Sequence, residues 1–144
     1  MTLVDTLTDD HRELDRLCRE LLRAARMRDL DGAVCARAGA CRALLRHVAR
    51  EELLLHAPAI ASGGATCALS RQFRHDMAAI GRRFADFTQD WTRDRIAGDW
   101  RGFTEAAELL IALLLRRLSA KAARLYPLVT PQPTRPTATR SATG

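Results

Sequence analysis

The chain has 144 residues, 47% of them hydrophobic, and its 23 Lys and Arg against 17 Asp and Glu give a formal net charge of +6. This length suits one domain with a sizeable core, and the composition is typical of a soluble globular protein. The longest apolar run, within residues 109–115, is far too short to cross a bilayer, which excludes a membrane-spanning chain.

The N-terminal segment indicates a cytoplasmic protein. MTLVDTLTDDHREL is acidic and lacks the positively charged start and apolar run of a signal peptide, so we expect none. The four cysteines form no CxxC pair, and two of them lie on apolar helix faces. We expect all four to be reduced, as is usual in the cytoplasm: Cys18, Cys35, Cys41 and Cys67.

The pattern along the chain predicts an all-α protein, because strand-like alternation is absent and helical periodicity dominates. Ser62-Gly63-Gly64 is a strong helix stop. The Pro/Thr-rich end of the chain is typical of disorder. We predict an up-down-up-down four-helix bundle in residues 1–128, with helices at about 8–28, 33–60, 66–92 and 99–127, and a disordered tail at 129–144.

The first predicted helix carries a line of arginines opposite its apolar face. An acidic partner such as nucleic acid could bind a stripe of this kind. However, Glu13 and Glu20 flank it and can form ion pairs within the helix, and no aromatic residues interleave for base stacking. We therefore expect a solvated face and no nucleic-acid binding for Arg12, Arg16, Arg19, Arg23 and Arg26.

Three polar residues interrupt the apolar faces of the first two helices. His11 lies at the edge of the face of the first helix, while His47 and Glu51 are i,i+4 neighbours on the face of the second. A single histidine on such a face is usually a hydrogen-bonded core residue. Three convergent groups instead indicate descent from a metal site.

The fourth helix places two cations on its apolar face. Arg117 and Lys121 share the face of Leu110 and Leu114 when residues are spaced 100° apart. Unpaired buried charges cost several kcal/mol, so both cations require nearby carboxylates.

At these positions the chain resembles the hemerythrin-like cation-binding family. The matching motifs are DDHRELDRL, LLRHVAREELLL and the closing RLYPL, within about residues 5–128. The resemblance implies a bundle holding two irons through a His from the first helix, a His-x-x-x-Glu from the second, His from the third and a His-x-x-x-carboxylate from the fourth. Residue by residue, only His11, His47 and Glu51 carry over.

The remaining ligand positions depart from the family pattern. Arg117 and Lys121 stand at the ligand positions of the fourth helix. On the third helix His75 points away from the inward face, where Met77 stands instead. We expect a charged layer of Arg117, Lys121, Glu51 and Asp76 in place of the metal, and no cofactor. The alternative is iron or another divalent metal held by His11, His47 and Glu51 with water.

The other polar residues suggest no enzyme. We expect Glu52 at the surface or a helix contact, and His56 about 180° from His47, too far round to share a site. No nucleophile triad or phosphate loop is recognisable. The fourth helix is apolar nearly all round, which indicates either deep packing or a homodimer or protein-partner interface at Ile111, Leu115 and Leu118. Two functions remain: a metal-free interaction or regulatory module, and a metal-binding protein for oxygen, nitric oxide or iron.

Overall fold

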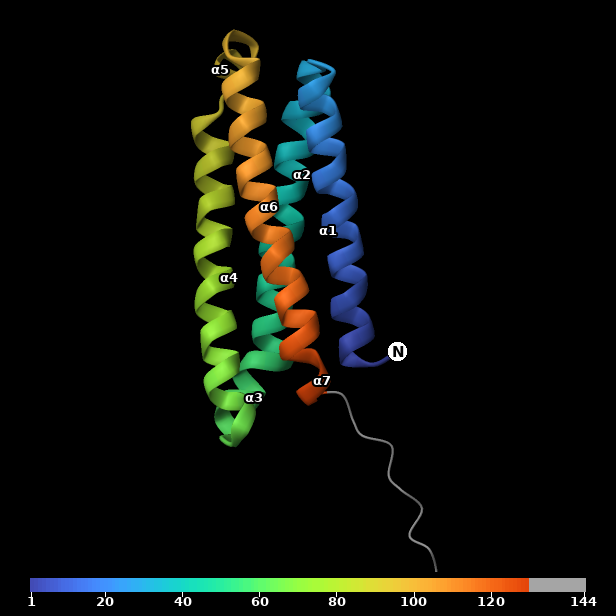
Figure 1. Ribbon diagram of the computed structural model, residues 1–144, viewed down its shortest axis with the longest axis vertical. Helices are drawn as coiled ribbons and strands as arrows, with labels where there is room; N and C mark the ends of the chain where they lie inside the picture. Colours follow the sequence, from blue (N-terminus) through green and yellow to red (C-terminus); the bar gives the residue numbers. More distant parts are fainter. Residues whose placement is uncertain (130–144) are drawn as a thin grey trace, which may run out of the picture.

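The computed structural model describes residues 1–129, and within them every element is helical, which confirms the all-α prediction. Four long helices lie side by side along the molecule, with α1 and α4 running opposite to α2 and α6 (Figure 1). In chain order the elements are α1 (Leu3–Arg26), α2 (Leu30–Glu51), η1 (Glu52–His56), α3 (Ala57–Ser62), α4 (Ala65–Asp90), α5 (Arg93–Gly98), α6 (Trp100–Arg124) and α7 (Tyr126–Val129).

Side-chain caps explain where the long helices begin. Thr2 and Asp5 form a capping box at the start of α1, so the helix begins about five residues earlier than predicted. Asp29 caps α2 and Asp99 caps α6, each by accepting from a backbone N–H three residues on. These contacts satisfy amides that would otherwise have no partner within the helix.

The connections agree with the predicted breaks but contain more helix. Gly63 and Gly64 adopt φ values of +68° and +85°, which favour glycine, and they separate α3 from α4. The predicted loop between residues 93 and 99 forms the short helix α5, capped by the Thr92 side chain. Val129, assigned to the tail by the sequence, is the last residue of α7, and the rest of the predicted tail lies outside the described residues.

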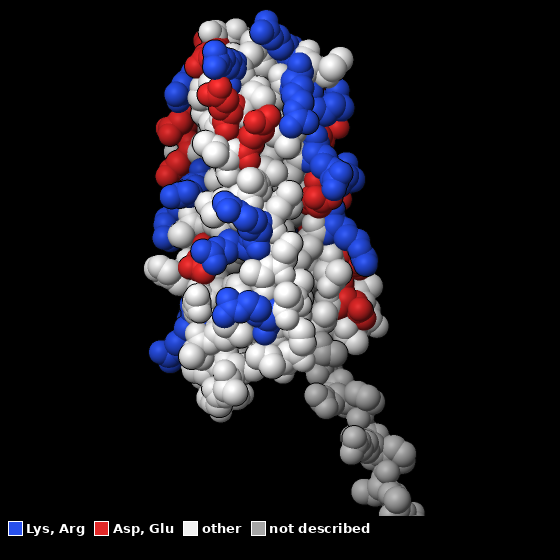
Figure 2. All heavy atoms as spheres, viewed as in Figure 1, with Lys and Arg blue, Asp and Glu red and all other residues white. Residues whose placement is uncertain are grey.

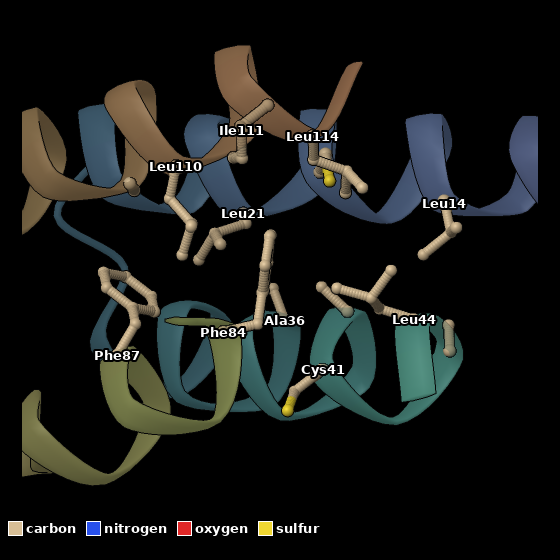
Figure 3. Packing of buried hydrophobic residues seen from close by; sticks show 14 of the residues in the cluster. Leu14, Leu21, Ala36, Cys41, Leu44, Phe84, Phe87, Leu110, Ile111 and Leu114 are labelled. Atoms are coloured by element: carbon tan, nitrogen blue, oxygen red, sulfur yellow. The ribbon is translucent and has the colours of Figure 1, made fainter. Parts of the chain in front are cut away.

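The main core fills the space between the four long helices. Each of the four helices contributes large apolar side chains that point into this space (Figure 3). They include Leu14 and Leu21 from α1, Leu44 from α2, Phe84 from α4 and Leu114 from α6. A second buried cluster lies at the end of the molecule that holds α7 and consists of Leu7, Leu55, Phe73, Leu125 and Tyr126. The polar site described below adjoins this second cluster, because Tyr126 belongs to both.

The sequence predicted one regular helix from about residue 33 to residue 60, but the structure interrupts this helix after Glu51. Residues Glu52–His56 form one turn of π-helix before the α-helical pattern resumes in α3. A π-turn holds more residues per turn than an α-helix, so it rotates the residues beyond it relative to those before. In η1, Leu55 and His56 are buried, whereas Leu53 and Leu54 face solvent.

Of the two alternatives left open for Ile111, Leu115 and Leu118, the burial of these residues favours deep packing within the chain. Ile111 and Leu118 are buried in the main core, and Leu115 packs partly buried against it. Helix α6 contacts α1 on one side and α4 on the other, so a wide apolar face is covered within the chain. The deep-packing alternative describes this helix.

The arginines of α1 face solvent and have acidic partners. Figure 2 shows basic and acidic side chains interspersed along the right-hand edge, where α1 runs in Figure 1. The partners along the helix are Asp9 for Arg12, Glu13 for Arg16, Asp15 for Arg19, Glu20 for Arg23 and, from α6, Glu108 for Arg26. This arrangement is the solvated, ion-paired face that the sequence predicted.

All four cysteines are free thiols. Burial raises the pKa of Cys18 to about 12, which keeps this thiol protonated and unreactive. Among residues 1–129, no helix combines the length and apolar character that crossing a membrane would require.

Candidate functional site: a buried lysine among histidine and carboxylate groups

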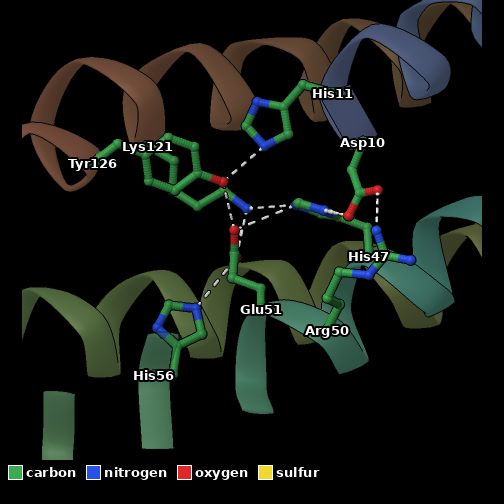
Figure 4. A network of polar contacts seen from close by, with 8 residues as sticks. All are labelled: Asp10, His11, His47, Arg50, Glu51, His56, Lys121 and Tyr126. Atoms are coloured by element: carbon green, nitrogen blue, oxygen red, sulfur yellow. Dashed lines mark hydrogen bonds and ion pairs between the residues drawn. The ribbon is translucent and has the colours of Figure 1, made fainter. Parts of the chain in front are cut away.

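Four helices bring polar side chains to one buried point near the α7 end of the molecule (Figure 4). His11 comes from α1, His47 and Glu51 from α2, Lys121 from α6 and Tyr126 from α7. His11, His47 and Glu51 each offer one ligand atom, and these three atoms lie within 4.8 Å of one another. The structure therefore brings these three residues together, as the sequence predicted.

Lys121 occupies the centre of this group. Its side chain is fully buried, and its Nζ donates to Glu51 Oε1 at 2.6 Å. The same ammonium lies 3.3 Å from His47 Nε2. Burial of an ion pair is tolerated only when its geometry is good and further hydrogen bonds satisfy the remaining polar atoms. Both conditions hold here.

Tyr126 satisfies the other oxygen of Glu51. Its hydroxyl donates to Glu51 Oε2 at 2.7 Å and lies 3.0 Å from His11 Nε2. Because the hydroxyl proton goes to the carboxylate, His11 Nε2 carries a proton and donates to the tyrosine oxygen. From the sequence, the closing RLYPL served only as a family motif, and this role of Tyr126 was missed.

Asp10 fixes the orientation of His47 from outside. Its Oδ2 lies 3.0 Å from His47 Nδ1, and its Oδ1 accepts from Arg50 at 2.8 Å. With Nδ1–H donating to this carboxylate, His47 Nε2 is left as an acceptor that faces Lys121. Asp10 immediately precedes His11 in the DDHRELDRL motif, but its contact with His47 on α2 can be recognised only from the fold.

His56 belongs to the site, and the prediction that it lies opposite His47 is wrong. The π-turn η1 rotates its ring inward, where it is buried and places Nε2 3.2 Å from Glu51 Oε1. The prediction assumed regular α-helical spacing over the nine residues from His47, and the extra residue in the turn invalidates that assumption.

Arg117 does not point at the core, contrary to the prediction. Its side chain is 41% exposed and lies 3.4 Å from Asp76, so these two residues form a separate pair at the surface between α4 and α6. The buried charged group therefore contains Lys121 but neither Arg117 nor Asp76. A long guanidinium side chain can turn outward along a helix surface, whereas the Lys121 amine is held by Glu51.

The remaining assignments on α4 and η1 agree with the structure. Met77 is buried on the inward face, while His75 is exposed. Glu52 forms an ion pair with Arg74 at 2.8 Å across the contact between η1 and α4. None of these side chains offers a ligand atom to the buried site.

The electrostatics of the site favour a charged Glu51. Burial alone would raise its pKa, but the hydrogen bond from the His56 imidazole and the charge of Lys121 outweigh that effect and hold the pKa well below its usual range. Burial lowers the pKa of Lys121, and Glu51 opposes this shift. Burial and the Glu51 charge both raise the pKa of Tyr126, which keeps its hydroxyl a donor.

His11 should make the protein sensitive to acid. Burial, and then the Lys121 charge, lower the pKa of His11 from 6.5 to about 3. Between about pH 6.5 and pH 3, His11 is therefore protonated in the unfolded chain but neutral in the folded protein. The free energy of unfolding should fall by up to about 1.4 kcal/mol per pH unit as the pH drops from 6.5 to 4.5.

The measurement is urea unfolding at several pH values on wild type and a His11→Gln variant. Over this window, the slope of the free energy of unfolding against pH should be smaller in the variant by up to about 1.4 kcal/mol per pH unit, which corresponds to the uptake of one proton on unfolding. Equal slopes would show that His11 takes up its proton in the folded protein as readily as in the unfolded chain.

The donor set of the site does not fit two iron ions. A di-iron centre of this bundle type needs ligands from all four long helices. Here α4 presents the weak thioether of Met77, and α6 presents the ammonium of Lys121, which cannot ligate a metal while protonated. His11, His47 and Glu51 alone match the ligand count of a single catalytic zinc ion.

The helices bring two histidines and a carboxylate from α1 and α2 together in the interior, around the ammonium of Lys121. A family model for the hemerythrin HHE cation binding domain matches residues 2–129, so the chain belongs to this family. The comparisons found no match among curated proteins or among solved structures. The resemblance inferred from the sequence motifs is therefore confirmed.

Proposed function

We propose that this hemerythrin-family protein is an up-down-up-down bundle in which Lys121 replaces the metal, and that it acts as a cytoplasmic, non-catalytic interaction or regulatory module. The observation that carries the proposal is the buried contact of 2.6 Å between Lys121 Nζ and Glu51 Oε1. A divalent ion at the same ligands would lie within a few ångströms of this ammonium. Repulsion at that range costs several kcal/mol even at an effective dielectric constant of about 20.

The hydrogen bonds around Lys121 support the same proposal. Glu51 accepts from Lys121 and His56 at one oxygen and from Tyr126 at the other. His11 donates to Tyr126 with the nitrogen that faces Glu51. The groups that would bind a cation are thus satisfied by the chain itself, and a metal would have to displace these contacts.

Exposed leucines support an interaction role. Leu53 is 72% exposed and Leu54 42% exposed on η1, and Leu128 on α7 is also exposed. Both elements lie at the end of the molecule that holds the polar site (Figure 1). Large apolar side chains grouped at one end of a protein are typical of a surface that binds another protein. The paired arginines of α1 give no reason to propose a nucleic-acid partner.

Elemental analysis tests the proposal. Wild-type protein from cells grown with added iron should carry well under one metal per chain after desalting, and it should lack the near-ultraviolet absorbance of oxo-bridged iron. The physical reason is the permanent cation at the site. The same growth and purification applied to a metal-binding protein of known stoichiometry supplies the positive control.

A second candidate function is metal binding by His11, His47 and Glu51, followed by iron, oxygen or nitric oxide chemistry. The proximity of three ligand atoms within 4.8 Å favours it. Stoichiometric iron or zinc that survives desalting of the wild type would establish this candidate and overturn the first.

A further inference from the structure

An open hollow of about 370 Å³ lies between the end of α1 and the start of α6. It is at the end of the molecule opposite α7 and the polar site (Figure 1). The indole of Trp100 and three arginines line it, and these arginines are Arg26, Arg28 and Arg101. Figure 2 shows basic and acidic side chains close together at this end of the molecule. Hollows of this volume are large enough to hold a small organic ligand.

The charges around the hollow leave one arginine without a counterion. Arg26 lies 3.3 Å from Glu108, and Arg101 lies 3.1 Å from Glu105; both carboxylates also line the hollow. The side chain of Arg28 forms no hydrogen bond or ion pair with any other residue in the described part of the chain. Three guanidinium groups against two carboxylates give the lining a net charge of +1.

The backbone of Arg28 adopts a conformation that favours glycine. Its φ is +52°, the only positive value outside glycine among the described residues. Its N–H donates to the Ala25 carbonyl at 3.2 Å, and the N–H of Asp29 donates to the Ala24 carbonyl at 2.9 Å, which is the Schellman pattern of a helix end. An arginine at this position costs conformational free energy that a glycine would not. Because no contact of its side chain within the described chain offsets this cost, the arginine is better explained by a role in binding than by a role in folding.

The side chains around the hollow determine which ligand would fit. A guanidinium group binds a carboxylate through two parallel hydrogen bonds. Trp100 packs partly buried against the core and offers a planar apolar wall for a ring. A monoanion would balance the net charge of the lining, whereas the second charge of a dianion would be repelled by Glu105 and Glu108.

We propose that this hollow binds a small aromatic monocarboxylate, with the carboxylate on Arg28 and the ring against Trp100. The hollow shares no residue with the polar site around Lys121. The inference therefore goes beyond the proposed function, and the two are tested separately.

Titration of the full chain with benzoate, followed by NMR, tests the site. Benzoate should bind at least about tenfold more tightly than acetate, which lacks the ring, and than benzyl alcohol, which lacks the charge. The indole N–H resonance of Trp100 should shift as benzoate is added. Equal affinities for the three compounds, or an indole resonance that does not move, would overturn the inference.

Phenyl phosphate tests the preference for a single charge. It carries two negative charges at about pH 8, because the second pKa of a phosphate ester is about 6. It should bind no more tightly than benzoate, since the lining balances only one charge. Tighter binding of phenyl phosphate would overturn the assignment of a monocarboxylate.

Arg28→Gly should change binding and stability in opposite directions. The loss of the guanidinium should weaken benzoate binding at least about tenfold. The removal of the side chain from a left-handed conformation should raise the folding equilibrium constant about threefold, measured by urea unfolding without ligand. A variant that binds benzoate like the wild type, or that is less stable than the wild type, would overturn the inference.

Arg71→Ala is the matched control. Arg71 is another exposed arginine, and it lies on α4, outside the hollow. Its removal lowers the net charge of the protein as much as Arg28→Gly does, but it should leave benzoate affinity within about twofold of the wild type. An equal loss of affinity in the two variants would show that benzoate responds to the net charge of the protein and would overturn the assignment to this hollow.

Discussion

Lys121→Ala should lower the free energy of unfolding by about 3–5 kcal/mol. The substitution removes the ammonium 2.6 Å from Glu51 and leaves a buried carboxylate without its countercharge. Stranding one member of a buried pair typically costs this much, although the intact pair itself contributes little. Chemical denaturation followed by circular dichroism at pH 7 measures the loss.

Two controls separate the buried charge from general disruption. The double variant Lys121→Met with Glu51→Gln strands no charge and should cost clearly less than Lys121→Ala. Arg117→Ala removes a half-exposed cation one helical turn away and should change stability by less than about 1 kcal/mol. Wild-type stability in Lys121→Ala would mean that the lysine is not paired with Glu51 in solution.

The same Lys121→Ala variant should gain a metal site. Without the ammonium, Glu51 Oε1 and His47 Nε2 are available, and with His11 they form three ligands within 4.8 Å. We expect Co²⁺ or Zn²⁺ to bind at least about a hundredfold more tightly than to wild type, since several kcal/mol of repulsion are removed. Cobalt absorbance in the visible range and isothermal calorimetry measure the gain.

Metal should also restore part of the stability that the substitution removes. A ligand that binds only the folded state raises the free energy of unfolding by mass action. Lys121→Ala with His47→Ala serves as the control, because it lacks one ligand and should neither bind cobalt nor be stabilised by it. A folded Lys121→Ala protein with no affinity for cobalt would show that the three ligand atoms do not converge in solution.

The features predictable from the sequence are those that regular helical spacing determines. His47 and Glu51 are four residues apart on one helix, so their convergence needs no knowledge of the fold. Lys121 lies on the apolar line of α6, and its burial follows from that line. The glycine pair at Gly63 and Gly64 ends a helix because of its backbone freedom.

The features that escaped prediction depend on neighbouring elements. The π-turn changes the direction of His56 by about the rotation of one residue, roughly 100°, and nothing in Glu52–His56 signals it. Arg117 lies on the same helix face as Lys121, and only the position of Asp76 on α4 turns it outward. Asp10 and Tyr126 act through partners 37 and 75 residues away in sequence, at His47 and Glu51.

The sequence could not decide between the two alternatives for α6 for a similar reason. A helix that is apolar nearly all round can either pack deeply or form an interface, and the sequence supports both readings. Ile111 and Leu118 are buried because α1 and α4 flank the helix on both sides. That arrangement is a property of the whole bundle and not of the helix.

The burial of Lys121 also determines the labelling chemistry of the protein. Lysine occurs once among the 144 residues, and the fold encloses its amine completely. Amine-reactive dyes, biotin esters and aldehyde-coated surfaces should therefore attach to the folded protein only through its N-terminal amino group. This gives uniform, oriented attachment without added residues, and a second label in a mass spectrum would report molecules in which the polar core has opened.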